Sequence, residues 1–168
     1  MKKILVSIFL LVFGLCLTAC ANKGIDFKVS YDSMAAFGHK KIDGKYYTFN
    51  NAYLTSKEQL IALCDEWNNK SFDENDEYYN SDLKTLIRSY GDEYFELNNL
   101  IIIEFETGQG IDTKVKNISI EENRIIVNIK QKQKNGIWTT EAFSWLMIVE
   151  VSKENTIGVT ELVVNIKK

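Results

Sequence analysis

Few residues in this chain of 168 have the types and spacing that catalysis or metal binding requires. The single histidine, His39, is followed by two lysines and has no sequence neighbour that could orient it as a general base. The acidic stretch 73–77 has the alternate spacing of a calcium loop. However, Tyr78 and Lys84 occupy the places where an EF-hand needs glycine and glutamate. We therefore predict two solvated loops, no catalytic residue, no metal site, no cofactor and no enzymatic activity.

The three cysteines have different expected roles. Cys64 has no disulfide partner in the domain, and the neighbouring Asp65 and Glu66 disfavour a thiolate. We therefore interpret Cys64 as a small buried residue on a helix face, with a thiol nucleophile as the alternative. Cys16 and Cys20 lie near the N-terminus, in a segment with a different purpose.

The first twenty residues have the order of a secretory signal. Two lysines precede an apolar run of about fourteen residues, 4–17, which is shorter than a membrane span and typical of a signal peptide. The stretch Leu17-Thr18-Ala19-Cys20 resembles the lipobox of bacterial lipoproteins, in which a peptidase cuts just before the cysteine. That resemblance implies a signal peptide at residues 1–19 and acyl chains such as palmitate on Cys20.

The lipobox resemblance implies a lipid-anchored protein on the extracytoplasmic face of a bacterial cell membrane. Residues 20–26 would then be the lipidated N-terminus and a short linker, and residues 27–168 a single extracytoplasmic domain. The six residues after the cysteine reach at most about 20 Å. Loss of residues 1–19 removes two lysines and changes the net charge from −3 to −5. An acidic domain argues against nucleic acid as a partner.

The rest of the chain predicts an α+β fold, with two helices packed on an antiparallel sheet or a small β-sandwich. Residues 55–59 start a helix, because they offer two overlapping capping boxes. Apolar residues at helical spacing follow, namely Leu60, Leu63, Cys64 and Trp67. A second helix is predicted from about residue 82 to Gly91, with one further turn at 92–96.

Strands dominate the remaining sequence. The apolar run 100–105 predicts a central strand that is buried on both faces. Further strands are expected at 27–31, 113–120, 124–130, 144–151 and 158–166, and a short strand or hairpin is expected at 45–49. Turns are expected at Asp43-Gly44 and Asn135-Gly136. The short connections predict antiparallel pairing.

Two groups of residues could contact a ligand. Gly108, Gln109 and Gly110 follow the central strand and form a candidate binding loop, with an ordinary hairpin turn as the alternative. Glycine there permits a positive φ or a close approach of the backbone. An aromatic group at 46, 47, 49 and 53 could face a ligand, but we predict that it packs in the core.

The motifs of the C-terminal half occur in a recognisable order. Residues 92–103 lead into 108–110, then a strand, a turn at Glu122-Asn123, a second strand and residues 145–153. This order resembles small uncharacterised lipoproteins of Gram-positive bacteria and, more distantly, the C-terminal domain of PrcB-type protease-complex subunits. That family usually has a Thr-Gly-Gly-Tyr-like turn, where this chain has residues 107–111.

The resemblance implies a non-catalytic, β-rich partner of an extracytoplasmic protease or another surface protein. We therefore expect a membrane-anchored module that binds a protein or peptide. The alternative is an extracytoplasmic hydrolase that uses carboxylates from loops, since paired carboxylates have no fixed spacing in a sequence.

Overall fold

The apolar run at 100–103 lies within β5 (Asn98–Gly108), the strand on which both cores of the protein are built. The computed structural model describes residues 24–138 and 141–168. Leu100 and Ile102 face one apolar cluster, and Ile101 and Ile103 face another. Successive side chains of a strand point to opposite faces, so β5 is buried on both, as predicted.

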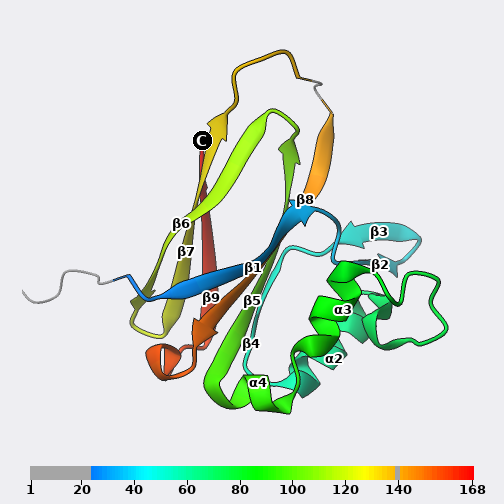
Figure 1. The fold of residues 1–168 in the computed structure, drawn as a ribbon, viewed down its shortest axis with the longest axis vertical. Helices are drawn as coiled ribbons and strands as arrows, with labels where there is room; N and C mark the ends of the chain where they lie inside the picture. The colour runs from blue at the N-terminus through cyan, green and yellow to red at the C-terminus, as the bar shows by residue number, and fades with distance from the viewer. Residues whose placement is uncertain (1–23, 139–140) are drawn as a thin grey trace, which may run out of the picture.

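Two larger sheets, a two-stranded hairpin, three α-helices and two short 3-10 helices make up the described part of this α+β fold (Figure 1). The first sheet is antiparallel with the order β1-β8-β5-β4, and its other strands are β1 (Phe27–Met34), β4 (Asn51–Leu54) and β8 (Ala142–Ser152). The second has the order β6-β7-β9, with β6 (Ile111–Glu121), β7 (Arg124–Gln133) and β9 (Glu161–Lys167). The two sheets pack face to face through the cluster that contains Ile101 and Ile103.

The antiparallel prediction is wrong for one pair, because β9 runs parallel to β7. The chain leaves β7 for β8 in the other sheet, passes the short helix η2 (Glu154–Thr156) and then returns as β9. Since β8 reverses the chain direction, β9 runs the same way as β7. The short connections therefore join strands that pack across the sandwich, as well as strands that pair.

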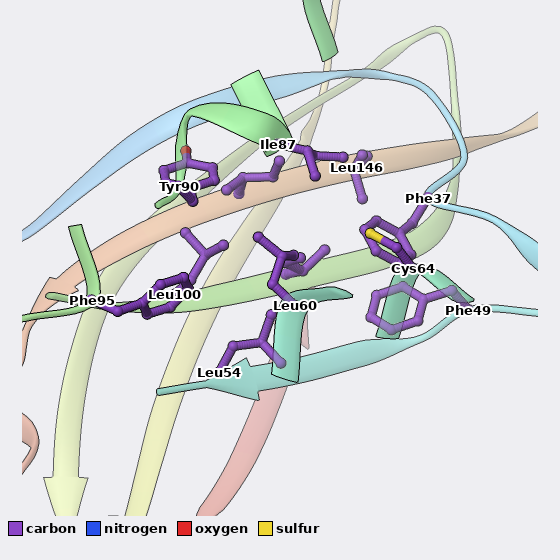
Figure 2. Close-up of a cluster of buried hydrophobic side chains, with 12 residues drawn as sticks. Phe37, Phe49, Leu54, Leu60, Cys64, Ile87, Tyr90, Phe95, Leu100 and Leu146 are labelled. Atoms are coloured by element: carbon purple, nitrogen blue, oxygen red, sulfur yellow. The ribbon is translucent and has the colours of Figure 1, made fainter. Parts of the chain in front are cut away.

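The helices cover the outer face of the first sheet (Figure 2). They are α2 (Lys57–Glu66), η1 (Lys70–Phe72), α3 (Asp82–Ser89) and α4 (Asp92–Leu97). At the start of α2, the Ser56 side chain accepts from the Gln59 N–H, and the Gln59 side chain accepts from the Thr55 N–H at 2.7 Å. This reciprocal capping confirms the predicted helix start. The further turn predicted at 92–96 is α4.

Cys64 lies in the core between α2 and the first sheet, as predicted (Figure 2). It is 1% exposed, and burial raises the pKa of its thiol to about 12. A thiol in such a setting is inert at neutral pH.

A separate hairpin consists of β2 (His39–Ile42) and β3 (Lys45–Thr48), which among the described strands pair only with each other. The turn predicted at Asp43-Gly44 joins them, and both residues have a positive φ, of 50° and 81°. The strand predicted at 27–31 is part of β1, which pairs with β8. The sequence analysis named no strand at the residues of β2 or β4, although the hairpin that it allowed around Asp43-Gly44 is present.

Residues 1–19 and Cys20, the predicted signal peptide and attachment point, lie outside the described residues. Ile25 falls within the predicted linker 20–26, yet its N–H donates to the Ile118 carbonyl at 2.8 Å. Contact with the folded domain therefore begins before β1. Within the part of the chain that the structure describes, none of the helices has the length and apolar character to cross a membrane.

Candidate functional site

The β2–β3 hairpin carries three exposed apolar side chains within six residues of the chain. Ile42, Tyr46 and Tyr47 are 45%, 69% and 46% exposed. The exposed Lys41 and Lys45 flank them, and the Lys41 ammonium lies 5.3 Å from the centre of the Tyr46 ring. We call these five residues the hairpin surface. Lys41 and Tyr46 lie on one face of the hairpin, and Ile42, Lys45 and Tyr47 lie on the other, because neighbouring residues of a strand point to opposite faces. Exposed apolar neighbours such as Ile42 and Tyr47 mark sites of interaction.

The prediction that this aromatic group packs in the core is wrong for Tyr46 and Tyr47. Phe49 is buried at 4% exposure and Tyr53 is half-buried, so the prediction holds for the residues that follow β3. Because β2 and β3 join neither sheet, the side chains on them have no opposing layer. His39 is exposed at the start of β2, with its ring centre 5.6 Å from that of Tyr46.

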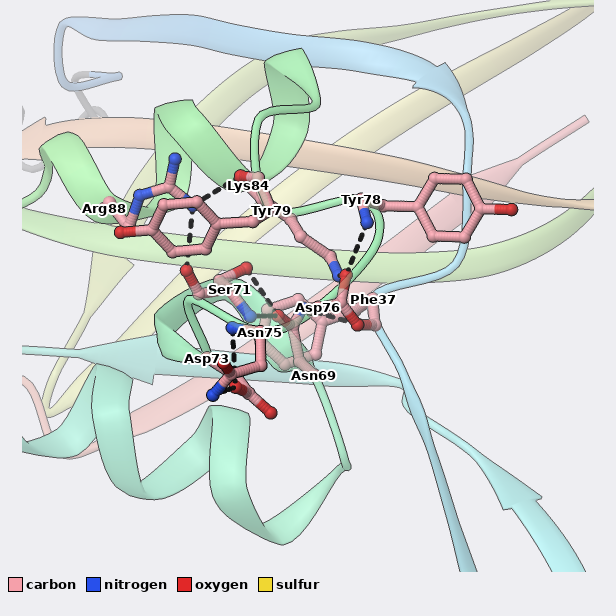
Figure 3. Close-up of polar contacts among 10 residues, drawn as sticks. All are labelled: Phe37, Asn69, Ser71, Asp73, Asn75, Asp76, Tyr78, Tyr79, Lys84 and Arg88. Carbon is pink, nitrogen blue, oxygen red and sulfur yellow. Dashed lines mark hydrogen bonds and ion pairs between the residues drawn. The ribbon is translucent and has the colours of Figure 1, made fainter.

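The base of the hairpin is held by buried polar side chains (Figure 3). The Phe37 N–H donates to Oε2 of Glu104 at 2.8 Å, and the Phe37 carbonyl accepts from Nδ2 of Asn69 at 2.6 Å. The Phe37 ring is 2% exposed and packs 4.7 Å from the ring of Phe49. Glu104 is also buried, and its Oε1 has no hydrogen-bond partner among the described residues. The chain therefore enters the hairpin from a fixed point.

The next residues fasten the hairpin to the end of α2. A Cβ at Gly38 would lie 2.3 Å from the Trp67 carbonyl oxygen, a contact that only glycine avoids. The Lys40 ammonium lies 2.6 Å from the Glu66 carboxylate and 4.4 Å from the centre of the Trp67 ring. The hairpin surface is therefore carried on a rigid base, and Lys40 is engaged within the domain.

The same network extends into the long connection between α2 and α3 (Figure 3). Oδ1 of Asn69 accepts from the Ser71 N–H at 3.0 Å and from the Ser71 hydroxyl at 2.5 Å. Arg88 donates to the Ser71 and Tyr79 carbonyls at 2.9 and 2.6 Å, and its guanidinium lies 3.6 Å from the centre of the Tyr79 ring. These contacts hold a connection that has little regular structure of its own.

The acidic stretch 73–77 supports this connection. Asp73 accepts from the Asn75 N–H at 3.1 Å. Asp76 accepts from the Tyr78 N–H and pairs with Lys84, whose ammonium lowers the pKa of the Asp76 carboxyl. Among the residues with described positions, no group of three His, Cys, Asp or Glu side chains is arranged to hold a metal ion.

The predicted loop at Gly108, Gln109 and Gly110 forms the turn between β5 and β6. These two strands belong to different sheets. Neither glycine has a positive φ. Instead, Gly110 permits a close approach, because a Cβ there would lie 2.5 Å from Cγ of Trp138. Trp138 is 42% exposed, and the adjacent Ile137 is fully exposed. Sequence reasoning missed both residues, although they directly follow the Asn135-Gly136 turn signal.

A pocket of about 460 Å³ lies beside this turn. Residues of β5, β7, the start of β6 and the last residue of the chain line it, namely Glu106, Thr107, Gly108, Ile111, Gln131, Lys132, Gln133 and Lys168. We call it the β5–β7 pocket. At its wall, the buried amide of Gln131 donates to the Thr107 hydroxyl at 3.3 Å. Of the predicted loop, the structure places Gly108 in the pocket and Gly110 under Trp138.

The carboxylates of Asp32 and Glu150 lie outside the hairpin surface and the β5–β7 pocket, and each accepts hydrogen bonds from other side chains. Burial raises the pKa of Asp32, an effect that the hydrogen bond from the Trp145 indole opposes and the nearby Asp112 reinforces. Glu150 accepts from the Ser30 hydroxyl and from Lys28 at 3.0 Å.

Neither carboxylate site has the form of a catalytic cleft. Asp32 is exposed as a residue, and the Asp112 side chain is 44% exposed, so water reaches both groups. The Glu150 carboxylate is already engaged by the Ser30 hydroxyl and the Lys28 ammonium. No protein-family model, curated protein or solved structure matches this chain.

Proposed function

We propose that this protein is a membrane-anchored extracytoplasmic lipoprotein whose domain is a non-catalytic binding module for a protein or peptide. The observation that carries the binding role is the hairpin surface, where Ile42, Tyr46 and Tyr47 are exposed on a clamped hairpin. The lipobox-like sequence supports removal of residues 1–19 and attachment through Cys20. Two or more acyl chains on that cysteine would give a stable anchor.

The composition and rigidity of the hairpin surface both suit recognition of a protein. Tyrosine is enriched among the residues that dominate binding energy, because its ring buries a large area with few rotatable bonds. A base fixed by Glu104, Asn69 and Trp67 reduces the ordering cost on binding. Lys41 and Lys45 favour an acidic patch on the partner. A surface protease or another wall-associated protein would provide such a partner.

The hydrolase alternative is less well supported by the carboxylates. A pair of catalytic carboxylates is expected in a cleft that excludes water, where the pKa of one group is raised. Asp32 and Asp112 are close enough to interact, but both are at the open surface. Exposed aromatic side chains, in contrast, support binding.

The test is a crosslinking pull-down of the native protein from detergent-solubilised cells, with mass spectrometry to identify partners. We expect a specific partner with the wild-type protein and its loss with the Tyr46→Ser/Tyr47→Ser double variant. Tyr78→Ser is the matched control, since Tyr78 is 64% exposed but lies outside the hairpin surface. Equal recovery with the double variant would show that the hairpin surface is not the binding site.

The anchor is tested by fractionation of the same cells. Wild-type protein should partition with the membrane and incorporate labelled palmitate, whereas Cys20→Ser should lose both properties. A Cys20→Ser variant that remains in the membrane fraction would refute attachment through this residue.

A further inference from the structure

Two strands of the sandwich are shorter than the neighbours with which they pair. β4 pairs with β5 only up to Asn51 opposite Ile103, while β5 continues to Gly108. β9 pairs with β7 up to Lys167 opposite Lys130, while β7 continues to Gln133. Figure 1 shows the two sheets continuing beyond the end of β9, which the letter C marks.

The hydrogen bonds of β5 show which backbone groups lie on its open edge. The Glu104 N–H donates to the Asn50 carbonyl at 2.6 Å, so the backbone groups of Glu104 point toward the β4 side. Backbone direction alternates along a strand, and Glu106 and Gly108 therefore point to the same side. Beyond Asn50, none of the described strands pairs with this edge.

The open edges of β5 and β7 meet at the β5–β7 pocket. Residues of both overhanging ends line it, and Lys168 lies beyond the last paired residue of β9. β4 and β9 are in contact with each other, so the two short strands end on the same side of the sandwich. The pocket is therefore a space next to unpaired strand edges.

We propose that the β5–β7 pocket binds an extended peptide segment of a partner protein, which adds as a strand to the open edge of β5. An unpaired strand edge presents a row of free donors and acceptors, and a peptide strand satisfies them with main-chain hydrogen bonds. The backbone groups of Glu106 and Gly108 supply these bonds. This site goes beyond the hairpin surface and uses none of its residues.

The charged groups of the pocket define the peptide further. The side chains of Lys132 and Lys168 are cationic, and the Glu106 carboxylate and the α-carboxylate of Lys168 are anionic. The Lys132 ammonium is available to pair with an acidic side chain of the peptide. The Thr107 hydroxyl and the Gln131 amide at the wall suit a polar side chain rather than an aliphatic anchor.

The test begins with a random decapeptide library displayed on phage and selected against the detergent-solubilised native protein. Selected peptides are synthesised and their affinities measured by fluorescence anisotropy. Glu106→Pro removes the N–H that faces the open edge and keeps every hydrogen bond between β5 and β8. The variant should fold, because proline is tolerated on such edges. We expect affinity at least tenfold weaker for Glu106→Pro. In the control Glu106→Gln, which keeps the N–H, affinity should be equal or tighter.

Peptides with methylated amide nitrogens provide a readout that does not depend on how well a variant folds. Alternate amides of a bound strand point to opposite edges, and only one edge would face β5. Methylation of the amides that face β5 should abolish binding, whereas methylation of the intervening amides should not. Tolerance of both methylation patterns, unchanged affinity for Glu106→Pro, or a library without binders would overturn the proposal.

Other occupants would also be revealed. Peptides that lose affinity with Tyr46→Ser/Tyr47→Ser instead would place the site on the hairpin surface, which refutes strand addition but leaves the proposed binding role intact. A dimer by light scattering that Glu106→Pro converts to a monomer would assign the edge to a second copy of this chain. A further outcome is that library peptides bind in a manner sensitive to Glu106→Pro while the cellular pull-down recovers no partner that depends on Tyr46 and Tyr47. That combination would refute the proposed role of the hairpin surface and support strand addition at β5.

Discussion

Replacement of Asn69 by alanine should destabilise the domain by about 3 kcal/mol, because this side chain satisfies three buried groups. It donates to the Phe37 carbonyl and accepts from both the N–H and the hydroxyl of Ser71. Phe37 and Ser71 are 2% and 0% exposed, so water cannot easily replace the lost partner. An unsatisfied buried group costs about 1–3 kcal/mol. The Ser71 hydroxyl can rotate, which leaves two groups that bear this cost.

The expected loss of unfolding free energy is measured by urea denaturation, with tryptophan fluorescence and circular dichroism as the two signals. For a domain of this size, about 3 kcal/mol corresponds to a fall in Tm of roughly 6–12 °C. Asn75→Ala is the matched control, because the Asn75 amide makes one long contact of 3.4 Å at the surface. That variant should stay within about 0.5 kcal/mol of wild type. A loss below about 1 kcal/mol for Asn69→Ala would refute the view that this network fixes the hairpin base.

Three further changes probe separate parts of the structure. Gly110→Ala should displace the Trp138 ring and alter tryptophan emission. Gly108→Ala should leave the emission unchanged, because its added Cβ would approach other atoms only to 3.8 Å. Identical spectra for the two variants would contradict the packing of Trp138 on Gly110. Cys64 should react with a thiol reagent at pH 8 only after denaturation, because burial raises the pKa of its thiol to about 12. The labelling of Cys64 is measured as the difference between wild type and Cys64→Ala. Rapid labelling of Cys64 in the native protein would contradict the burial of this side chain. Burial also raises the pKa of the Tyr90 and Tyr94 hydroxyls, so stability should be fully present below the unfolded-state pKa of about 10 and fall as the pH rises above it. Tyr90→Phe and Tyr94→Phe should flatten that fall in urea midpoints measured between about pH 9 and 11.

The elements with local signals were the ones that the sequence predicted well. The start of α2 depends on Ser56 and Gln59, which are three residues apart and cap the helix together. The two-sided burial of β5 follows from a run of large apolar residues that only a covered strand tolerates. In both cases the decisive contacts are encoded within a few neighbouring residues.

The missed features depend on distant parts of the chain. Tyr46 and Tyr47 look like core residues in a strand pattern, but a side chain is buried only where another layer covers it, and β2 and β3 have no such layer. The β5–β7 pocket arises from the lengths of β4 and β9, which are far apart in sequence. The parallel pairing of β9 results from the passage of β8 through the other sheet. No local pattern carries this information.

The position of the N-terminal end of β1 bears on which partner the hairpin surface can reach. The N-terminal end of β1 and the β2–β3 hairpin lie on opposite sides of the molecule (Figure 1). Since Ile25 already bonds to Ile118, residues 21–25 would separate a lipidated Cys20 from the domain, a reach of about 17 Å. If Cys20 is lipidated as we propose, a tether this short would keep the N-terminal end of β1 close to the membrane and direct the hairpin surface away from it. Lys41 and Lys45 would then meet an acidic protein surface rather than anionic lipid headgroups.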